Sequence, residues 1–138
     1  MRFQHTLVTD ATFRAEVLES RCPVLVEFRA EWSGASHIMD PVIDKISLYC
    51  GQRCKVCLVD YDVSRVVAHK YEITTLPTIL LFTEGHLSAR ISGPVSARAL
   101  EERMDALLGA KDVLEGSGPW PEVSPTDPDR QTENDRGE

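Results

Sequence analysis

Apolar and polar positions along this chain follow two periods in turn, one typical of strands and one typical of helices. Continuous apolar or β-branched runs predict strands at residues 3–8, 23–28, 54–59 and 77–82. A fifth strand is expected at 86–92, because Glu84 and Gly85 before it are typical of a hairpin turn. Apolar residues at helical spacing predict helices at about 9–20, from 34 onward, at 64–71 and at 96–109.

Capping and breaking residues define the ends of these helices. Thr9 or Asp10 can cap the first helix, and Ser96 can cap the last one, which Gly109 is expected to stop. Pro41 lies inside the second helix and predicts a kink there. That helix carries a broad apolar stripe of Ile38, Met39, Val42, Ile43 and Ile46.

The order of the predicted elements is βαβαβαββα. Strands that alternate with helices require parallel pairing through right-handed crossovers, whereas the hairpin adds one antiparallel pair. The fold class is therefore α/β, with a mixed central sheet and helices on both faces.

Composition divides the 138 residues into two parts. Residues 1–109 have enough apolar side chains for one compact domain. Residues 110–138 contain eight acidic and three basic residues, four prolines and few large apolar residues. Such a segment buries too little surface to offset the entropy of ordering its backbone, so we expect an acidic, proline-rich, disordered tail.

Charge and hydropathy exclude several classes of partner. The formal net charge is −7, which disfavours binding to nucleic acid. No apolar run approaches the roughly 20 residues that a membrane-spanning helix needs, so we expect no contact with a membrane. Residues 1–6 lack the apolar region of a secretory signal, which predicts a cytoplasmic protein with reduced cysteines. We expect it to be a monomer.

Several spaced motifs identify a family. They are residues 24–36, Pro41, residues 76–78, Gly85 and Gly93. In order and separation these residues resemble the thioredoxin family, and the resemblance covers residues 3–109. It implies a thioredoxin fold with a cis peptide bond before Pro77.

One segment departs from the family. Where thioredoxins carry Trp-Cys-Gly-Pro-Cys, this chain reads Trp32-Ser33-Gly34-Ala35-Ser36. A serine hydroxyl cannot form a disulfide and is a poor nucleophile without a general base. His37 follows Ser36 directly on the same helix and cannot face it, so we expect Ser33 or Ser36 to cap the first turn of the helix instead of acting as a catalyst. A degenerate active site is therefore expected.

The resemblance places Glu27 where thioredoxins usually hold a buried aspartate that assists proton transfer. The lysine found near that carboxylate in many family members is replaced by Leu58. Burial without a cation should raise the pKa of Glu27.

The family's protein-binding groove is retained. The resemblance assigns it Trp32, Gly34, Ala35, Thr75, Leu76, Pro77, Gly93 and Pro94. Without the cysteines, this groove predicts a redox-inactive protein that binds another protein non-covalently, as an adaptor or chaperone-like module. Such a protein needs no cofactor and no metal.

The remaining cysteines support an alternative function. Cys50 and Cys54 flank a loop where a disulfide or a sensor thiol is feasible, and Cys22 and Cys54 begin neighbouring strands, so they form a second conceivable pair. Cys54 and Cys57 point to opposite faces of a strand and make neither a convincing redox motif nor a convincing zinc site. The alternative is thus a thiol–disulfide oxidoreductase or redox sensor that uses Cys22, Cys50 or Cys54, at the end of the sheet opposite the family's active site.

A third hypothesis treats Ser33 and Ser36 as engineered replacements of cysteines. Ala35 and Leu58 also differ from the family pattern, which favours natural divergence.

Overall fold

The computed structural model describes residues 5–113 of the chain. Its elements follow the predicted order, with a short π-helix in the place of the first helix. They are β1 (Thr6–Val8), the π-helix η1 (Arg14–Leu18), β2 (Val24–Arg29), α1 (Gly34–Cys50), β3 (Lys55–Asp60), α2 (Arg65–Lys70), β4 (Thr78–Thr83), β5 (His86–Ser92) and α3 (Ala97–Val113). The α/β fold class with a mixed sheet is confirmed.

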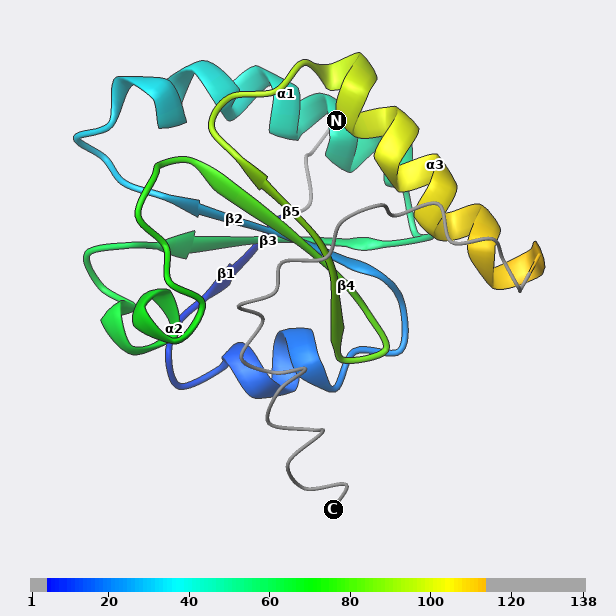
Figure 1. Cartoon of the computed structure of the whole chain (residues 1–138), viewed down its shortest axis with the longest axis horizontal. Helices are drawn as coiled ribbons and strands as arrows, with labels where there is room; N and C mark the ends of the chain where they lie inside the picture. The colour runs from blue at the N-terminus through cyan, green and yellow to red at the C-terminus, as the bar shows by residue number, and fades with distance from the viewer. Residues whose placement is uncertain (1–4, 114–138) are drawn as a thin grey trace.

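The five strands form one sheet in the order β1-β3-β2-β4-β5. Strands β1, β3 and β2 are parallel, whereas β4 is antiparallel to β2 and β5 is antiparallel to β4. The carboxyl ends of the three parallel strands therefore lie at the same end of the sheet, on the left in Figure 1.

Helices cover both faces of the sheet (Figure 1). On one face, side chains of α1 and α3, among them Ile43 and Leu100, are buried against the sheet. On the other face, side chains of η1 and α2, among them Val17 and Val67, are buried with an aromatic cluster of Phe13, Tyr71 and Phe82. The sheet thus has a separate apolar core on each side.

The structure differs from the prediction in the first helix and in the buried face of α1. Instead of one helix over 9–20, Thr9 begins a tight turn, and only Arg14–Leu18 is helical. The carboxylate of Asp10 does not cap this segment, because it binds the backbone of α2. The buried face of α1 is narrower than the predicted stripe: Met39, Ile43 and Ile46 are buried, whereas Ile38 is exposed.

The last helix passes its expected end. Helix α3 continues through Gly109 to Val113, and Gly109 does not have the positive φ of a glycine that ends a helix. Of the predicted tail, residues 114–138 lie outside the described residues. None of the helices within residues 5–113 is both long and apolar enough to cross a membrane.

Candidate functional site

The serines at the junction of β2 and α1 serve the backbone. Ser33 is the N-cap of α1, and its hydroxyl oxygen accepts the backbone N–H of Ser36 at 3.1 Å. The hydroxyl oxygen of Ser36 accepts the backbone N–H of Ala30 at 3.4 Å, and both serines are buried. The expected capping role of Ser33 is confirmed, and this junction carries no thiol.

His37, beside these serines, is exposed and engaged elsewhere. Its Nε2 lies 2.7 Å from the carbonyl oxygen of Glu31, and its Nδ1 lies 3.5 Å from a carboxylate oxygen of Asp40. The contact with the Glu31 carbonyl is the main cause of a raised pKa for His37, and Asp40 adds to it. Both ring nitrogens are thus directed at oxygens other than the Ser36 hydroxyl, which leaves that hydroxyl without a base.

Glu27 is fully buried in the middle of the sheet. Within the described residues neither of its carboxyl oxygens has a hydrogen-bond partner. Desolvation raises the pKa of Glu27 to about 7, although the positive charge of Arg29 opposes the shift. The hypothesis of a raised pKa is confirmed, but the expectation of burial without a cation is wrong. Arg29 Nη1 lies 3.8 Å from Glu27 Oε1, and Arg29 also pairs with Asp40.

The residues assigned to the protein-binding groove are only partly joined by contacts. The peptide bond from Leu76 to Pro77 is cis, as the resemblance implies, and the backbone N–H of Gly93 donates to the carbonyl of Pro77 at 2.8 Å. Trp32 is 66% exposed, and its indole N–H donates to Asp62 at 2.7 Å. Gly34 and Ala35 begin α1, Thr75 precedes β4, and Pro94 follows β5. Binding of a partner protein in this groove stays a prediction.

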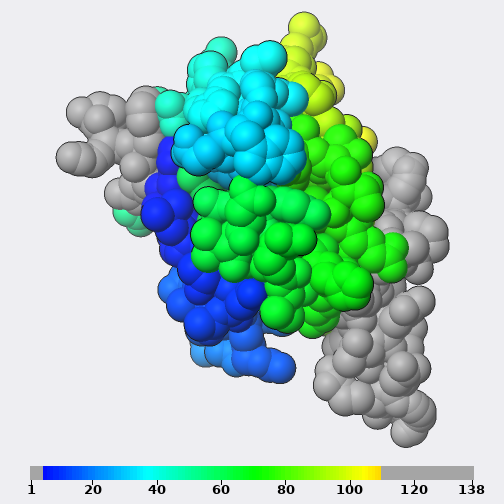
Figure 2. All heavy atoms as spheres, turned by 90° about the vertical axis from the view of Figure 1, so that its left-hand side faces the viewer, coloured from blue at the N-terminus to red at the C-terminus, as the bar shows by residue number. Residues whose placement is uncertain are grey.

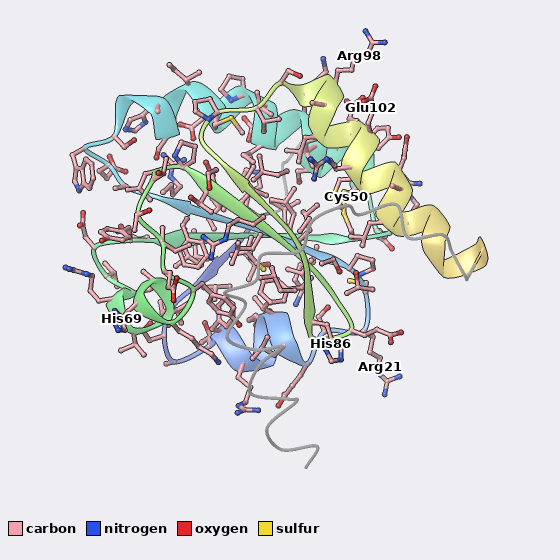
Figure 3. All side chains as sticks on the ribbon, viewed as in Figure 1. Arg21, Cys50, His69, His86, Arg98 and Glu102 are labelled. Atoms are coloured by element: carbon pink, nitrogen blue, oxygen red, sulfur yellow. A yellow bond between two sulfur atoms is a disulfide. The ribbon has the colours of Figure 1, made fainter. Side chains whose placement is uncertain are left out.

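At the opposite end of the sheet, Cys50 and Cys54 form a disulfide, so the expectation of reduced cysteines is wrong for this pair. Cys50 is the last residue of α1, Cys54 immediately precedes β3, and their Cα atoms are 5.5 Å apart. Figure 3 shows the sulfur–sulfur bond beside the label of Cys50, on the side of the sheet where α3 lies. Cys50 is 1% exposed and Cys54 is 7% exposed, so large molecules have little direct access to this bond.

A cavity of about 300 Å³ leads to the disulfide. Cys54 lines it together with Ser47, Gly51, Lys55 and Cys22. The ammonium group of Lys55 is held by Glu16, whose carboxylate oxygen lies 2.9 Å from Nζ. Of the two disulfide-bonded residues, Cys54 thus borders this cavity and Cys50 does not.

The two free cysteines differ in accessibility. Cys22 is half-buried, and its sulfur lies 3.6 Å from the hydroxyl oxygen of Ser20. Cys57 is fully buried, and desolvation raises the pKa of its thiol to about 12, so it is almost never a thiolate. Cys54 and Cys57 belong to the cores on opposite faces of the sheet, as expected from the strand period.

From the sequence alone, the Cys50–Cys54 pair is a weaker candidate site than the groove. The available signal was the spacing of two cysteines across a short loop that contains Gly51, which allows the tight approach a disulfide needs. Within residues 5–113, no group of three or more histidine, cysteine or acidic side chains is arranged to hold a metal ion.

Comparison with known proteins supports the family. The family model described as Thioredoxin matches residues 4–106. Thioredoxin 1 of Synechococcus elongatus is 40% identical over 101 residues, which cover 73% of this chain and 94% of the relative. Thioredoxin of Pseudomonas aeruginosa is 35% identical over 99 residues, covering 72% of this chain and 92% of the relative. Thioredoxin of Rickettsia felis is 44% identical over 78 residues, covering 56% of this chain and 74% of the relative.

These findings correct the principal functional expectation. A redox-inactive adaptor with a degenerate active site is wrong, because the relatives are named thioredoxins and this chain holds a disulfide between Cys50 and Cys54. The findings favour the alternative, in which the remaining cysteines carry thiol–disulfide chemistry.

Proposed function

The chain belongs to the thioredoxin family, and on that premise we propose that it is a thiol–disulfide oxidoreductase or redox sensor whose redox pair is Cys50 and Cys54. The disulfide between these two residues, within a thioredoxin domain whose usual motif carries serines, is the observation that supports this function.

The reaction is a two-step exchange of disulfides. A thiolate from a reductant attacks one sulfur of the Cys50–Cys54 bond, forms a mixed disulfide with it and releases the other sulfur as a thiolate. A second thiolate attacks the reductant's sulfur in the mixed disulfide, which releases an oxidised reductant and leaves two protein thiols. Run in reverse, the two thiols reduce a substrate disulfide.

The cavity favours one direction of attack. Because Cys54 borders the cavity and Cys50 does not, the proposal assigns the attack to the sulfur of Cys54 and makes Cys50 the leaving group. Cys22 lines the same cavity, so it is placed to act as a third thiol. Cys57, deeply buried and with a raised pKa, takes no part.

Turnover is tested by the reduction of insulin with dithiothreitol as the electron source. We expect catalysis above the uncatalysed background, and we expect the Cys50→Ser/Cys54→Ser double variant to fall to that background. Cys57→Ala is the matched control, because it removes a thiol outside the proposed site. Full activity of the double variant would overturn the assignment, whereas a wild-type protein without turnover but with a reducible disulfide would favour the sensor.

A redox titration separates a functional disulfide from a structural one. Structural disulfides have reduction potentials below about −300 mV, whereas the reduction potential of thioredoxin is about −270 mV. We expect the Cys50–Cys54 pair to equilibrate with dithiothreitol or glutathione buffers above about −300 mV. A lower potential would mean that the bond only supports the fold.

Other expectations from the sequence stay predictions. They are a cytoplasmic location, a monomeric state, and the lack of nucleic-acid and membrane partners.

A further inference from the structure

A larger cavity, of about 530 Å³, lies at the amino ends of the parallel strands. It is lined by Arg21 and Pro23 before β2, by Arg53 before β3 and by Leu108 of α3. Figure 2 faces the other end of the molecule, where the dark blue, cyan and green segments meet at the carboxyl ends of these strands. Small-molecule sites in proteins measure about 300–1,000 Å³, so the cavity has room for one large side chain.

Part of the cavity lining is apolar, and part of it is a thiol. Pro23 is buried and Leu108 is half-buried. Cys22, a half-buried free cysteine, borders this cavity as well as the smaller one beside the disulfide. An aromatic side chain that filled the larger cavity would gain apolar burial against Pro23 and Leu108 and would cover Cys22.

The cavity also carries a surplus of positive charge. Arg21 and Arg53 are its basic lining residues, and Asp105 is its acidic one. The carboxylate of Asp105 already accepts the hydroxyl of Tyr49, and within residues 5–113 neither arginine forms an ion pair. Arg21 is exposed, and Figure 3 shows its side chain directed away from the sheet. The charge therefore favours an acidic occupant.

The chain supplies a segment that reaches this cavity directly after α3. Helix α3 ends at Val113, and its last four residues advance the chain by about 6 Å from Gly109, which lines the cavity. Six residues separate Val113 from Trp120, and in extended form they span up to about 20 Å. Gly116 and Gly118 among them favour a reversal of the chain. Trp120 is therefore close enough in sequence to return to the cavity.

The composition of this segment matches the cavity in polarity and charge. Residues 114–138 contain seven acidic and two basic residues. Trp120 lies between Pro119 and Pro121, and Glu122 follows. Proline restricts the backbone to extended conformations before docking, so less entropy is lost when the segment docks. A segment with no core of its own can thus become ordered on a surface that fits it.

We propose that residues 119–122 dock in this cavity of the same chain and cover Cys22. The indole ring of Trp120 lies against Pro23 and Leu108. The docked segment limits access of reagents and of other thiols to the sulfur of Cys22.

An ion pair between Glu122 and Arg21 fixes the docked segment. The tether to α3 keeps the segment at an effective concentration of about millimolar, so a few contacts of modest strength are sufficient. The docking does not depend on the redox function proposed for Cys50 and Cys54.

Fluorescence of Trp120 in the full chain tests the docking. Trp32→Phe removes the other tryptophan, which lies at the opposite end of the sheet. We expect acrylamide to quench Trp120 about threefold less in the folded protein than in the urea-unfolded chain, because a segment that is docked most of the time is rarely accessible. Equal quenching would overturn the proposal. Quenching that depends on protein concentration would place the segment in a second copy and would overturn it as well.

An exchange of charges tests the ion pair. In the Trp32→Phe background, Arg21→Glu and Glu122→Arg should each increase the quenching of Trp120, and the double variant that carries both should restore the protection. Glu138→Arg makes the same change of charge elsewhere in the segment, so it is the matched control and should leave the quenching unchanged. Equal effects of Glu122→Arg and Glu138→Arg, or a double variant without restored protection, would contradict the pairing.

Alkylation of Cys22 tests whether the segment covers the thiol. Trp120→Ala should raise the rate at which iodoacetamide modifies Cys22 by about threefold, because the cover is then lost. Trp32→Ala is the matched control and should leave this rate unchanged. An unchanged rate in Trp120→Ala would refute the cover over Cys22.

Discussion

The carboxylate of Asp10 accepts the backbone N–H of Val67 at 2.8 Å and that of Val66 at 3.2 Å. Asp10 follows β1, whereas the two valines lie in the first turn of α2, so an acidic residue 57 positions earlier in the chain caps this helix. Ser64, the local N-cap residue, makes no side-chain cap. The N-cap of α2 is thus supplied by a residue distant in sequence, Asp10, and not by the adjacent Ser64.

Replacement of Asp10 by alanine should destabilise the domain. The variant leaves the N–H groups of Val66 and Val67 without their acceptor, and loss of an N-cap costs about 1 kcal/mol. Urea denaturation gives the free energy of unfolding. Ser64→Ala is the control, because its hydroxyl has no partner to lose and its removal should be nearly neutral. Equal losses in both variants would contradict the capping role.

Glu27 should make stability depend on pH. Its pKa rises from 4.5 when unfolded to about 7 when folded, so the folded state binds the proton more tightly. The ionised carboxylate therefore reduces the stability of the fold progressively as pH rises from about 4.5 to 7, by about 3 kcal/mol in all. Glu27→Gln should gain stability over the wild type at pH 8 and none at pH 4. A difference that does not vary with pH would refute this explanation.

The free cysteines should react at very different rates. Cys22 is half-buried, whereas Cys57 is fully buried with a pKa raised to about 12. Treatment of the folded, unreduced protein with iodoacetamide at pH 8 should label Cys22 and leave Cys57 unmodified until the chain is unfolded. Peptide mass spectrometry reads out both positions. Comparable labelling of Cys57 in the folded protein would show that the core opens more readily than its burial implies.

Two glycines should respond oppositely to alanine. Gly109 lies inside α3, and a Cβ atom added there meets no heavy atom within 4 Å, so Gly109→Ala should stabilise the helix by about 0.5–1 kcal/mol. Gly85 has φ +82°, and an added Cβ would lie 2.7 Å from the carbonyl oxygen of Leu18. Gly85→Ala should therefore destabilise by more than about 1 kcal/mol. The midpoints of thermal unfolding of both variants check the sign.

Elements with a strong period could be predicted from the sequence. The apolar runs predict β2, β3 and β4, because a fully buried strand needs consecutive apolar residues. Glu84 and Gly85 predict the hairpin, because its turn needs residues that adopt positive φ. The first helix and the end of α3 could not be predicted in this way. Asp10 looks like a local cap but binds α2, and Gly109 looks like a stop but tolerates helical geometry.

The candidate site was harder to predict than the fold. The serines at positions 33 and 36 favour a binding groove over a redox site, whereas the pairing of Cys50 with Cys54 depends on where α1 ends and β3 begins. The cation beside Glu27 was missed because Arg29 is two residues away on the same strand, where its long side chain can still reach back. The pattern of apolar residues does not show whether a long side chain such as that of Arg29 contacts a neighbouring carboxylate.

The bond between Cys50 and Cys54 joins residues only four positions apart. The chain-entropy relation for so short a ring gives about 2 kcal/mol of stabilisation, less than half of what a bond across a hundred-residue loop supplies. Reduction would therefore remove a small part of the stability of a typical domain, and the two cores on either side of the sheet would stay packed. If the pair carries the proposed thiol–disulfide exchange, opening and closing this bond would leave the rest of the domain folded.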